Sequence, residues 1–362
     1  MPRLLIDTEK LRDLNSGLGQ FCLHLGHELV RQRPDDNDWQ LTFLVAKGQS
    51  GIFGDAVQYR EVGWHDRLWR TDEFDLWHST HQKSAYQPAR KSRLVLTIHD
   101  LNYLERPDYS ASRKARETAA VQQHVSRASA VTVISEYTAS VVKQHLNFRQ
   151  GVDPQVIYNG VAKPPEPSFF QEIPDFLQET PGNESRPFFL FLGIIHPKKN
   201  VHVLLPLLEA FPDYRLVLAG NNGHSYAQHI RQQAQELGVS DRLLMPGAVD
   251  EPTKWRLYAD CEAFLFPSLS EGFGLPVVEA MSLGKPVFLS NLTSLPEIGG
   301  REAVYFADFE PDTLVETFRA GMIAFYEDPL KADRLRWQAR RFSWEKAAKA
   351  YWAVYAQVAH QT

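Results

Sequence analysis

The stretch FLFPSLSEGFGLPVVEAMSLGKPVFLS, residues 264–290, decides how this chain folds. Its apolar start, residues 264–266, predicts a short buried strand, and a small polar loop follows. Pro276 suits the first turn of a helix because its fixed φ angle matches helical geometry, and Gly284 just past the apolar run ends that helix. The stretch therefore predicts a buried strand, a loop, a helix over residues 276–283 and a second strand.

The loop between this strand and this helix is suited to bind an anion. Gly272 and Gly274 let the backbone come close to a ligand. We therefore expect the amides of Phe273, Gly274 and Leu275 to point outward. Outward amides, together with the positive end of the helix dipole, make the kind of site that a diphosphate requires.

Two glutamates flank this expected anion site. Glu271 precedes it and Glu279 lies in the first turns of the helix, with seven residues between them. Because a carboxylate competes with a phosphate, its natural use here is to accept hydrogen bonds from sugar hydroxyls beside the diphosphate. The residue types therefore indicate one carboxylate for each of two sugars and amides for the phosphates between them.

Strand-like and helix-like patterns alternate along the rest of the chain, on both sides of a proline-rich stretch. Residues 160–187 contain six prolines and no periodic strand, which predicts a linker with one short helix. The alternation predicts an α/β fold of two doubly wound, Rossmann-like parallel sheets that face each other across a cleft. The expected strands are 3–7, 41–46, 74–78, 94–98, 131–134, 188–193, 215–219, 242–246, 262–266, 286–290 and 303–306, and the expected helices are 18–31, 112–127, 200–210, 225–237, 252–259 and 276–283.

The domain boundaries follow from this pattern. We expect an N-terminal domain over residues 1–165, a linker over 166–187 and a C-terminal domain over 188–342. Residues 343–362 form one amphipathic helix that can pack back on the N-terminal domain or on the other one. Because ligands bind beyond the carboxyl ends of parallel strands, the cleft between the domains is the expected small-molecule site.

Composition excludes several other classes of protein. The 362 residues include 39 Lys and Arg against 44 Asp and Glu, so the net charge of −5 leaves no overall basic footprint for nucleic acid. Cys22 and Cys261 lie far apart and form neither a disulfide scaffold nor a cysteine zinc site. The start of the chain lacks the pattern of a signal peptide, and the longest apolar run is about eight residues against the roughly 20 of a membrane span. We expect a soluble, cytoplasmic protein.

With these motifs the chain resembles glycosyltransferase family 4, whose members are retaining enzymes with the GT-B fold. Glu271 and Glu279, in the context EGFGLPVVEAM, match the E-x7-E signature of that family. The resemblance covers nearly the whole chain. Its other motifs are SGLGQF (16–21), TIHDL (97–101), VISEYTAS (133–140), VIYNGV (156–161), LGIIHPKKN (192–200), LAG (218–220) and FSWEKAA (342–348).

The resemblance implies roles for the donor-binding residues. Glu271 would contact the donor sugar and Glu279 the ribose of the nucleotide. Lys199 fits the lysine that holds the donor diphosphate. The helix dipole supports this role, because a lysine at the positive start of a helix is unfavourable unless an anion lies nearby. The family often has arginine where Ile194 stands, so Lys198 becomes the substitute.

Further contacts are implied on both sides of the cleft. Gly17 and Gly19 lie in a turn that would line the cleft near the donor, although Cys22 breaks the Rossmann fingerprint and a plain tight turn remains the alternative. Residues 247–261 resemble the segment whose backbone meets the nucleobase, near Val249. Asp250 is expected to cap the helix that follows.

Histidines mark the ends of two strands in the N-terminal half. The resemblance implies that His99 lies near the donor sugar and the acceptor. Asp100, His78 and His81 are candidates for the acceptor side. We expect no metal, because GT-B enzymes do not require a divalent ion for the diphosphate. The acidic run 35–38 has the look of a metal motif but reads as a solvated turn.

These observations predict a retaining glycosyltransferase. It would move a sugar from a nucleotide-diphosphate sugar, with GDP-mannose or a related hexose donor favoured, to a glycan or lipid-linked acceptor in polysaccharide synthesis. No cofactor is required, and Lys199 with the helix amides would stabilise the departing diphosphate. A sugar-nucleotide epimerase, a phosphorylase and a non-catalytic assembly subunit are the alternatives. The basic run 113–116 allows peripheral contact with the inner membrane or is a solvated helix face, and the oligomeric state is left open.

Overall fold

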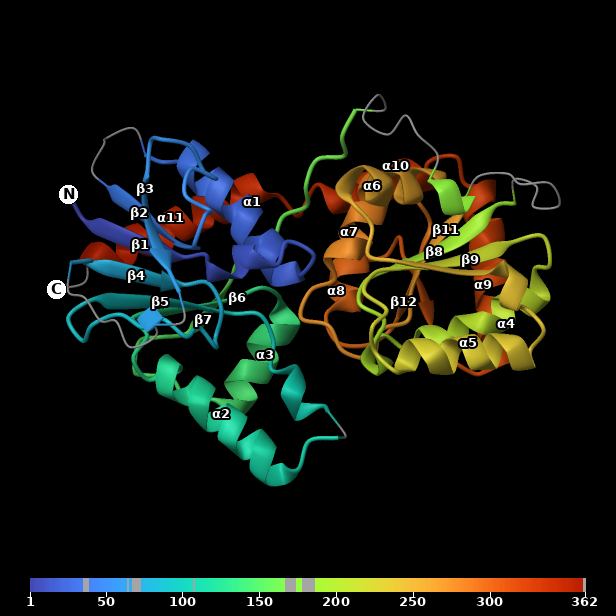
Figure 1. Cartoon of the computed structure of the whole chain (residues 1–362), viewed down its shortest axis with the longest axis horizontal. Coiled ribbons are helices and arrows are strands. Elements are labelled where there is room, and N and C mark those ends of the chain that lie inside the picture. The colour runs from blue at the N-terminus through green and yellow to red at the C-terminus, as the bar shows by residue number, and fades with distance from the viewer. Residues whose placement is uncertain are drawn as a thin grey trace. The chain divides into compact units, whose positions relative to one another are not determined.

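The computed structural model of the chain describes two compact units (Figure 1). The described residues are 1–34, 39–63, 65–66, 73–106, 108–166, 174–177 and 186–360. The first unit is Met1–Gly160 together with Ser343–Thr362, and the second is Val161–Phe342. The proline-rich stretch thus belongs to the second unit and the C-terminal helix to the first, while the acidic run 35–38 lies outside the described residues.

In the part that the structure describes, the first unit holds a seven-stranded parallel sheet of order β3-β2-β1-β4-β5-β6-β7. Its elements are β1 (Arg3–Asp7), η1 (Glu9–Arg12), α1 (Gly17–Arg31), β2 (Gln40–Ala46), β3 (Gln58–Val62), β4 (Leu76–Ser79), β5 (Arg93–Ile98), η3 (Asn102–Leu104), α2 (Ala111–Val125), β6 (Ala130–Val133), α3 (Glu136–His145), β7 (Pro154–Val156) and α11 (Trp344–His360). The strand order reverses between β1 and β4, so this is the switch point of the sheet.

The second unit holds a six-stranded parallel sheet over its described residues, of order β10-β9-β8-β11-β12-β13. Its elements are η5 (Asp175–Leu177), β8 (Phe188–Leu192), η6 (Pro197–Lys199), η7 (Val201–Leu204), α4 (Leu205–Ala210), β9 (Arg215–Ala219), α5 (Tyr226–Glu236), η8 (Ser240–Arg242), β10 (Leu243–Gly247), α6 (Glu251–Asp260), β11 (Ala263–Phe266), α7 (Leu275–Ser282), β12 (Val287–Ser290), α8 (Leu295–Gly299), β13 (Val304–Phe306), α9 (Pro311–Glu327) and α10 (Lys331–Ala339). The order reverses between β8 and β11.

The expected fold class is confirmed, since both units are parallel sheets of the Rossmann type. Every expected strand is present to within a few residues. Two strands were missed, β3 and β7. The first is an edge strand with mostly exposed side chains, and the second is three residues long and begins at Pro154. Neither therefore produces the buried apolar run by which the other strands were found.

Serine caps start three helices of the first unit. The hydroxyls of Ser16, Ser110 and Ser135 accept hydrogen bonds from backbone amides three residues further on, at the starts of α1, α2 and α3. Each bond satisfies one of the amides that the first helical turn leaves without a partner. These caps place the helix starts directly after strands or loops of the sheet.

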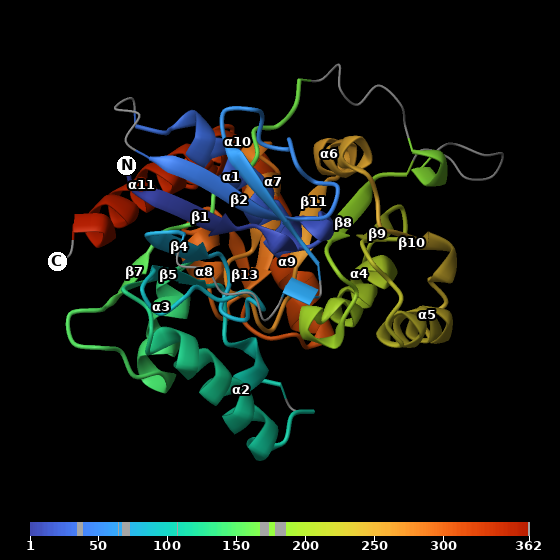
Figure 2. The same ribbon diagram turned by 60° about the vertical axis from the view of Figure 1, so that its left-hand side comes forward.

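The C-terminal helix α11 packs on the sheet of the first unit, and both ribbon views show it alongside those strands (Figures 1 and 2). The hydroxyl of Tyr351 lies 3.0 Å from Thr97 Oγ1 and 3.4 Å from Thr132 Oγ1. The hydroxyl of Tyr355 lies 2.7 Å from Nδ1 of the buried His78. Buried hydroxyl contacts of this kind fix the helix to one position on the sheet, because each broken contact would leave a polar atom without a partner.

We expect Tyr355→Phe to lower the free energy of unfolding by about 1–3 kcal/mol, because it leaves the buried Nδ1 of His78 without its partner. Chemical denaturation checks this. Tyr137→Phe is the matched control, since its hydroxyl contacts Glu105 at the surface, and it should change the free energy by less than about 0.5 kcal/mol. Equal losses in the two variants would contradict the anchoring role of Tyr355.

Candidate functional site

The candidate site of the second unit lies at the carboxyl ends of β8 and β11, where the strand order of that sheet reverses. Loops that leave the sheet from these two neighbouring strands run to opposite faces, so they leave a crevice in which ligands bind. The loop after β8 carries Lys199, and the loop after β11 carries Glu271. The structure therefore brings these two expected residues together, although 72 positions separate them in the sequence.

Lys199 and Glu271 form a largely buried ion pair. Nζ of Lys199 donates to Oε1 of Glu271, and the two side chains are only 12% and 11% exposed. The hydroxyl of Ser268 donates to the same oxygen at 2.6 Å. Burial opposes ionisation of Glu271, but the charges of Lys199 and Lys198 and these hydrogen bonds outweigh it, so the pKa of Glu271 lies below its usual value.

Side chains and backbone of three segments hold the loop around Glu271. The amide of Leu269 donates to the carbonyl of Lys198 at 2.8 Å. The amide of Glu271 donates to Thr293 Oγ1 at 3.1 Å, and the hydroxyl of Ser294 donates to the carbonyl of Glu271 at 3.1 Å. The loop therefore has a defined shape before any ligand is bound, which reduces the entropy lost on binding.

The start of α7 has no capping side chain and follows a glycine. Gly274, the N-cap residue, has a φ of 107°, a conformation that glycine adopts readily, and no side chain caps the helix. A Cβ atom at this position would lie 3.0 Å from Cδ2 of Leu295. The first turn, at Leu275, thus presents the positive end of the helix without a capping side chain. Diphosphate binding by Phe273, Gly274 and Leu275 stays a prediction.

The side chain of Glu279 is held by two residues of α6 that were not predicted from the sequence. Nζ of Lys254 lies 3.0 Å from Oε1 of Glu279, and the hydroxyl of Tyr258 donates to Oε2 at 2.8 Å. The spacing of Lys254 and Tyr258 indicates that they share one helix face. Nothing in the sequence indicates that this face meets Glu279, 25 and 21 positions further on.

The remaining donor-side candidates lie on the same unit. Lys198 is half-buried, and its amide donates to Nδ1 of His196 at 3.2 Å. Val249 is half-buried in the turn before α6, and Asp250 caps that helix by accepting from the amide of Thr253 at 2.9 Å, as expected. The helix expected to open at residue 200 is instead a series of short 3-10 turns followed by α4.

Gly17 and Gly19 both lie in the first turn of α1. A Cβ atom at Gly19 would fall 2.0 Å from the carbonyl oxygen of Asp13, whereas nothing lies within 4 Å of one at Gly17. Gly19 is therefore required by the packing of the turn itself, which was the plain alternative for this motif. Packing does not require a glycine at position 17.

The strand-end histidines of the first unit have different surroundings. His78 is fully buried, with its ring nitrogens 2.7 Å from Tyr355 Oη and 2.8 Å from Thr97 Oγ1, so it supports the core and does not line an acceptor surface as expected. His99 donates from Nε2 to the carbonyl of Thr80 at 2.8 Å, and burial lowers its pKa to about 4. His99 is therefore neutral near pH 7. The side chain of Asp100 accepts from the amide of Asn102 at 3.2 Å.

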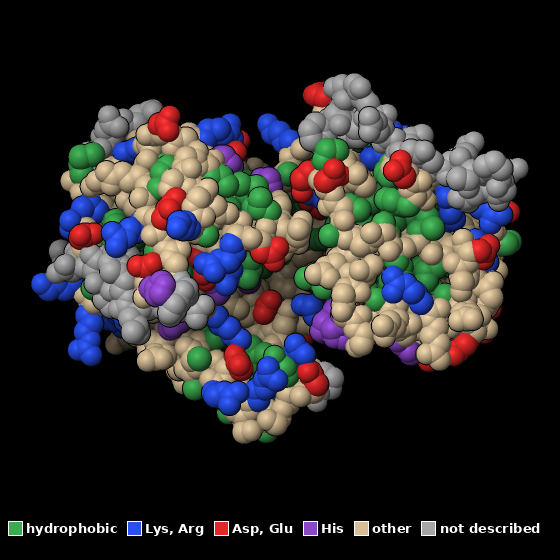
Figure 3. Space-filling model, viewed as in Figure 1, with side chains coloured by type: hydrophobic (Ala, Val, Ile, Leu, Met, Phe, Trp, Pro, Cys, Tyr) green, Lys and Arg blue, Asp and Glu red, His purple; other side chains and the backbone are tan. Residues whose placement is uncertain are grey.

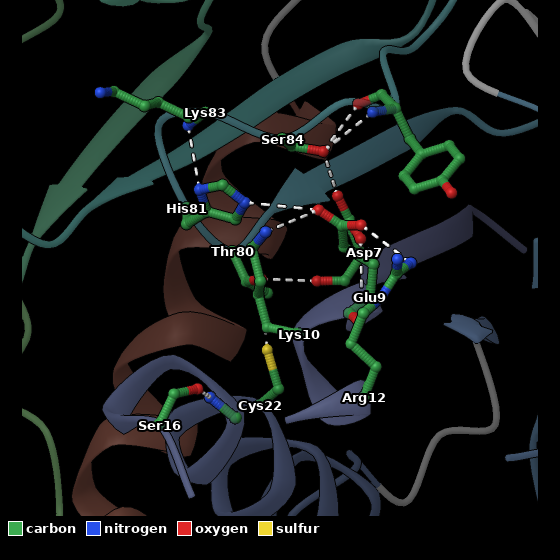
Figure 4. A network of polar contacts seen from close by, with 12 residues as sticks. Asp7, Glu9, Lys10, Arg12, Ser16, Cys22, Thr80, His81, Lys83 and Ser84 are labelled. Carbon is green, nitrogen blue, oxygen red and sulfur yellow. Dashed lines mark hydrogen bonds and ion pairs between the residues drawn. The ribbon is translucent and has the colours of Figure 1, made fainter. Parts of the chain in front are cut away.

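Figure 4 shows a polar network that surrounds His81 at the carboxyl ends of β1 and β4. The amide of Lys83 donates to Nδ1 of His81 at 3.0 Å, so the ring proton lies on Nε2, which faces Oε1 of Glu9 at 3.6 Å. Glu9 also contacts Lys10 and Arg12, each at 3.1 Å. Burial opposes its ionisation, but His81 and the two cations lower the pKa of Glu9 to about 2.

The pKa of Asp7 in the same network is shifted in the opposite direction. It is fully buried, and desolvation raises its pKa to about 7, although Ser84 and the amide of Glu9 donate hydrogen bonds to it. Neither Asp7 nor Glu9 was predicted from the sequence. Their one signal was position, since an acid at a strand end of a parallel sheet lies on the ligand side.

Other features of the described ranges bear on ligands and membranes. No three or more His, Cys, Asp or Glu side chains there are grouped so that they could hold a metal ion. None of the helices in those ranges combines the length and apolar character that a membrane span needs. Lys and Arg side chains gather over α2 among acidic ones (Figure 3), and Arg113 in this run lies 3.6 Å from the ring centroid of Tyr109.

Comparison with known proteins first gives the class. The chain superimposes on the sucrose-phosphate synthase of Thermosynechococcus elongatus with a TM-score of 0.74 and 16% identity, covering 99% of both chains. That likeness and the two Rossmann-like sheets define the GT-B fold. Residues 53–163 match the family model "Glycosyltransferase Family 4", and residues 172–342 match "Glycosyl transferases group 1". The chain belongs to glycosyltransferase family 4, as its motifs predicted, and is a hexosyltransferase.

Several curated relatives are named as mannosyltransferases. The chain is 29% identical to the O-antigen chain mannosyltransferase B of Escherichia coli over 278 residues, which are 73% of this chain and 70% of that protein. It is 35% identical to the serotype-specific mannosyltransferase WbdA of Escherichia coli over 169 residues, 44% of this chain but only 20% of WbdA. A GDP-mannose:cellobiosyl-diphosphopolyprenol alpha-mannosyltransferase of Komagataeibacter xylinus is 30% identical over 190 residues, 51% of this chain and 48% of that protein.

We expect Lys199→Met to lower the free energy of unfolding by about 3 kcal/mol, because it leaves the buried carboxylate of Glu271 without its cation. The double variant Lys199→Met/Glu271→Gln should recover part of this loss, since glutamine carries no charge. Urea denaturation at pH 7 without nucleotide measures both. A double variant less stable than Lys199→Met would show that the pair does not hold the loop.

We expect the contribution of Asp7 to the free energy of unfolding to depend on pH. Its folded pKa of about 7 lies above the ordinary 3.8, so the folded state keeps a proton that the unfolded chain has lost. The stability that Asp7 contributes is therefore fully present below about pH 4 and is lost as the pH rises through 7. Relative to wild type, Asp7→Asn should gain about 3–4 kcal/mol between pH 4 and pH 8.

The matched control for this measurement is Asp108→Asn. Asp108 is an exposed acid whose pKa is lowered by its hydrogen bonds with Arg106, so its variant should show no gain with rising pH. Denaturation curves at several pH values measure all three proteins. A pH-independent difference between Asp7→Asn and wild type would mean that Asp7 is ionised in the folded state.

Proposed function

We propose that this glycosyltransferase is a retaining mannosyltransferase that transfers mannose from GDP-mannose to a glycan or lipid-linked acceptor in polysaccharide synthesis. The observation that carries the proposal is the buried Lys199–Glu271 pair beside the uncapped start of α7. This arrangement offers a carboxylate for sugar hydroxyls and a cation with helix amides for a diphosphate. A nucleotide-diphosphate sugar carries both groups side by side.

The relatives support the choice of sugar and nucleotide. Three of them are named as mannosyltransferases, and one of those names includes GDP-mannose as the donor. One of the names refers to an O-antigen chain and another to a diphosphopolyprenol, which supports a polysaccharide or lipid-linked acceptor. A cytoplasmic location at the inner membrane face fits such an acceptor and belongs to the same proposal.

We propose that the donor binds to the second unit and that different residues there bind its sugar, diphosphate, ribose and base. Glu271 accepts hydrogen bonds from the mannose, and Lys199 with Lys198 and the start of α7 holds the diphosphate. Glu279 accepts from the ribose, and the backbone near Val249 meets the base. The buried position of Glu271 strengthens its hydrogen bonds, because charges interact more strongly away from water.

The proposed chemistry is a front-face displacement. The bond from the anomeric carbon to the diphosphate oxygen breaks, the acceptor hydroxyl bonds to the same face, and the leaving phosphate takes its proton. Lys199 and the amides of α7 stabilise the charge that develops on the leaving group. His99 would act as a neutral ring, in agreement with its low pKa, and the acceptor would bind mainly to the first unit.

A thermal-shift panel of ADP, CDP, GDP, UDP and GDP-mannose tests the donor. GDP and GDP-mannose should raise the melting temperature most, because a ligand at 100 times its Kd adds about 2.7 kcal/mol to stability. Glu271→Gln should reduce transfer of mannose from GDP-mannose to a polyprenol-linked glycan extract at least about 100-fold. Glu209→Gln, an exposed glutamate on α4, is the control that should keep full activity.

Three results would contradict separate parts of the proposal. A larger increase in melting temperature with another nucleotide would show that GDP is not the nucleotide of the donor. Full activity in Glu271→Gln would show that Glu271 is not part of the active site. A product with the opposite anomeric configuration to the donor, seen in the NMR coupling of the anomeric proton, would exclude retention.

A further inference from the structure

The carboxylate of Glu279 is held from two directions by one helix. Nζ of Lys254 lies 3.0 Å from Oε1, and the hydroxyl of Tyr258 donates to Oε2 at 2.8 Å. The side chains of Lys254 and Glu279 are 11% and 12% exposed, and Tyr258 is fully buried. Each carboxylate oxygen therefore has one protein partner and keeps acceptor capacity for a second donor.

Lys254 is positively charged although its side chain is buried. Burial opposes the ammonium, but Glu279 and Glu251 outweigh it, and the pKa of Lys254 lies above its usual value. Nζ of Lys254 contacts Glu251 at 2.9 Å, and that glutamate is half exposed. Because a buried cation needs its partner, Lys254 ties the orientation of Glu279 to that of α6.

The same helix follows the segment that the proposed function assigns to the base. Val249 lies in the turn that leads into α6, and Asp250 caps the helix. Lys254 and Tyr258 lie one and two turns further on, on one face of the helix. A single rigid element thus connects the proposed base contact with the carboxylate proposed to meet the ribose.

We propose that Lys254 and Tyr258 are positioning residues that fix the carboxylate of Glu279 to accept hydrogen bonds from the ribose hydroxyls, and so determine preference for ribonucleotides over deoxyribonucleotides. The inference rests on the proposed function and deepens it. Tyr258 is too deeply buried to touch a nucleotide, so it acts through Glu279. A carboxylate already held in place loses little freedom when the ribose binds, and this is what makes its hydrogen bonds effective.

Binding of ADP, CDP, GDP and UDP, each beside its 2′,3′-dideoxy analogue, tests the proposal by calorimetry. Wild type should bind the preferred ribonucleotide about tenfold or more tightly than its dideoxy analogue, the effect of one charge-assisted hydrogen bond. In Lys254→Met and in Tyr258→Phe this ratio should fall to less than about threefold. Affinity for the dideoxy analogue should stay at its wild-type value, because that analogue has no hydroxyl for Glu279 to accept from.

Two variants separate this role from a structural one. Lys254→Arg keeps a cation and should restore most of the ratio. Lys285, just before β12, is another half-buried lysine, and its Nζ donates to the carbonyl of Cys261 at 2.9 Å. The control variant Lys285→Met should leave the ratio unchanged. In Glu279→Gln the ratio should already be lost, and adding Lys254→Met should lower it no further.

The possible failures are distinguishable. If Lys254→Met weakens the ribonucleotide and the dideoxy analogue by the same factor, Lys254 acts on the phosphates or on the fold and the proposal is overturned. It is also overturned if folded Tyr258→Phe and Lys254→Met keep the wild-type ratio. If wild type binds none of the four ribonucleotides, the proposed function itself fails and this inference with it.

Discussion

The loop before α7 depends on a buried ion pair between Lys199 and Glu271. Removing two charges from water is unfavourable, and only a close pair with further hydrogen bonds compensates for it. The sheet meets this condition because β8 and β11 are neighbours whose loops leave at the same end. Ser268 adds a hydrogen bond to the carboxylate, and Thr293 fixes the backbone amide of the same residue. The shape of the loop before α7 follows from these contacts.

The same topology gives the two units different electrostatics. In each sheet the order reverses next to its first strand, and charged residues gather at that point. In the second unit the carboxylate stands beside a cation and is ionised. In the first, burial and the nearby charge of Glu9 raise the pKa of Asp7 to about 7, while His81 and two cations keep Glu9 ionised. The balance between burial and nearby charges, and not the residue type, therefore decides the direction of each pKa shift.

The sequence predicted much of the donor site but little of what supports it. Glu271, Glu279 and Lys199 were found because their spacing and neighbours form recognisable motifs. Lys254, Tyr258, Asp7 and Glu9 were missed because a lone lysine, tyrosine or acid carries no signal until its partner is known. His78 was wrongly placed on the acceptor side, since a strand-end histidine looks the same whether it faces a ligand or the hydroxyl of a distant tyrosine.

By itself the sequence determined the class of fold and the chemistry of its main loop. Apolar runs, glycines and prolines act over a few residues, so strands and most helices could be located without knowing what they pack against. Only the tertiary structure decided which polar groups meet. Lys199 reaches Glu271 across 72 positions and Tyr355 reaches His78 across 277. Such contacts depend on the order of strands in the sheet and on where the last helix packs, and these are properties of the whole folded unit.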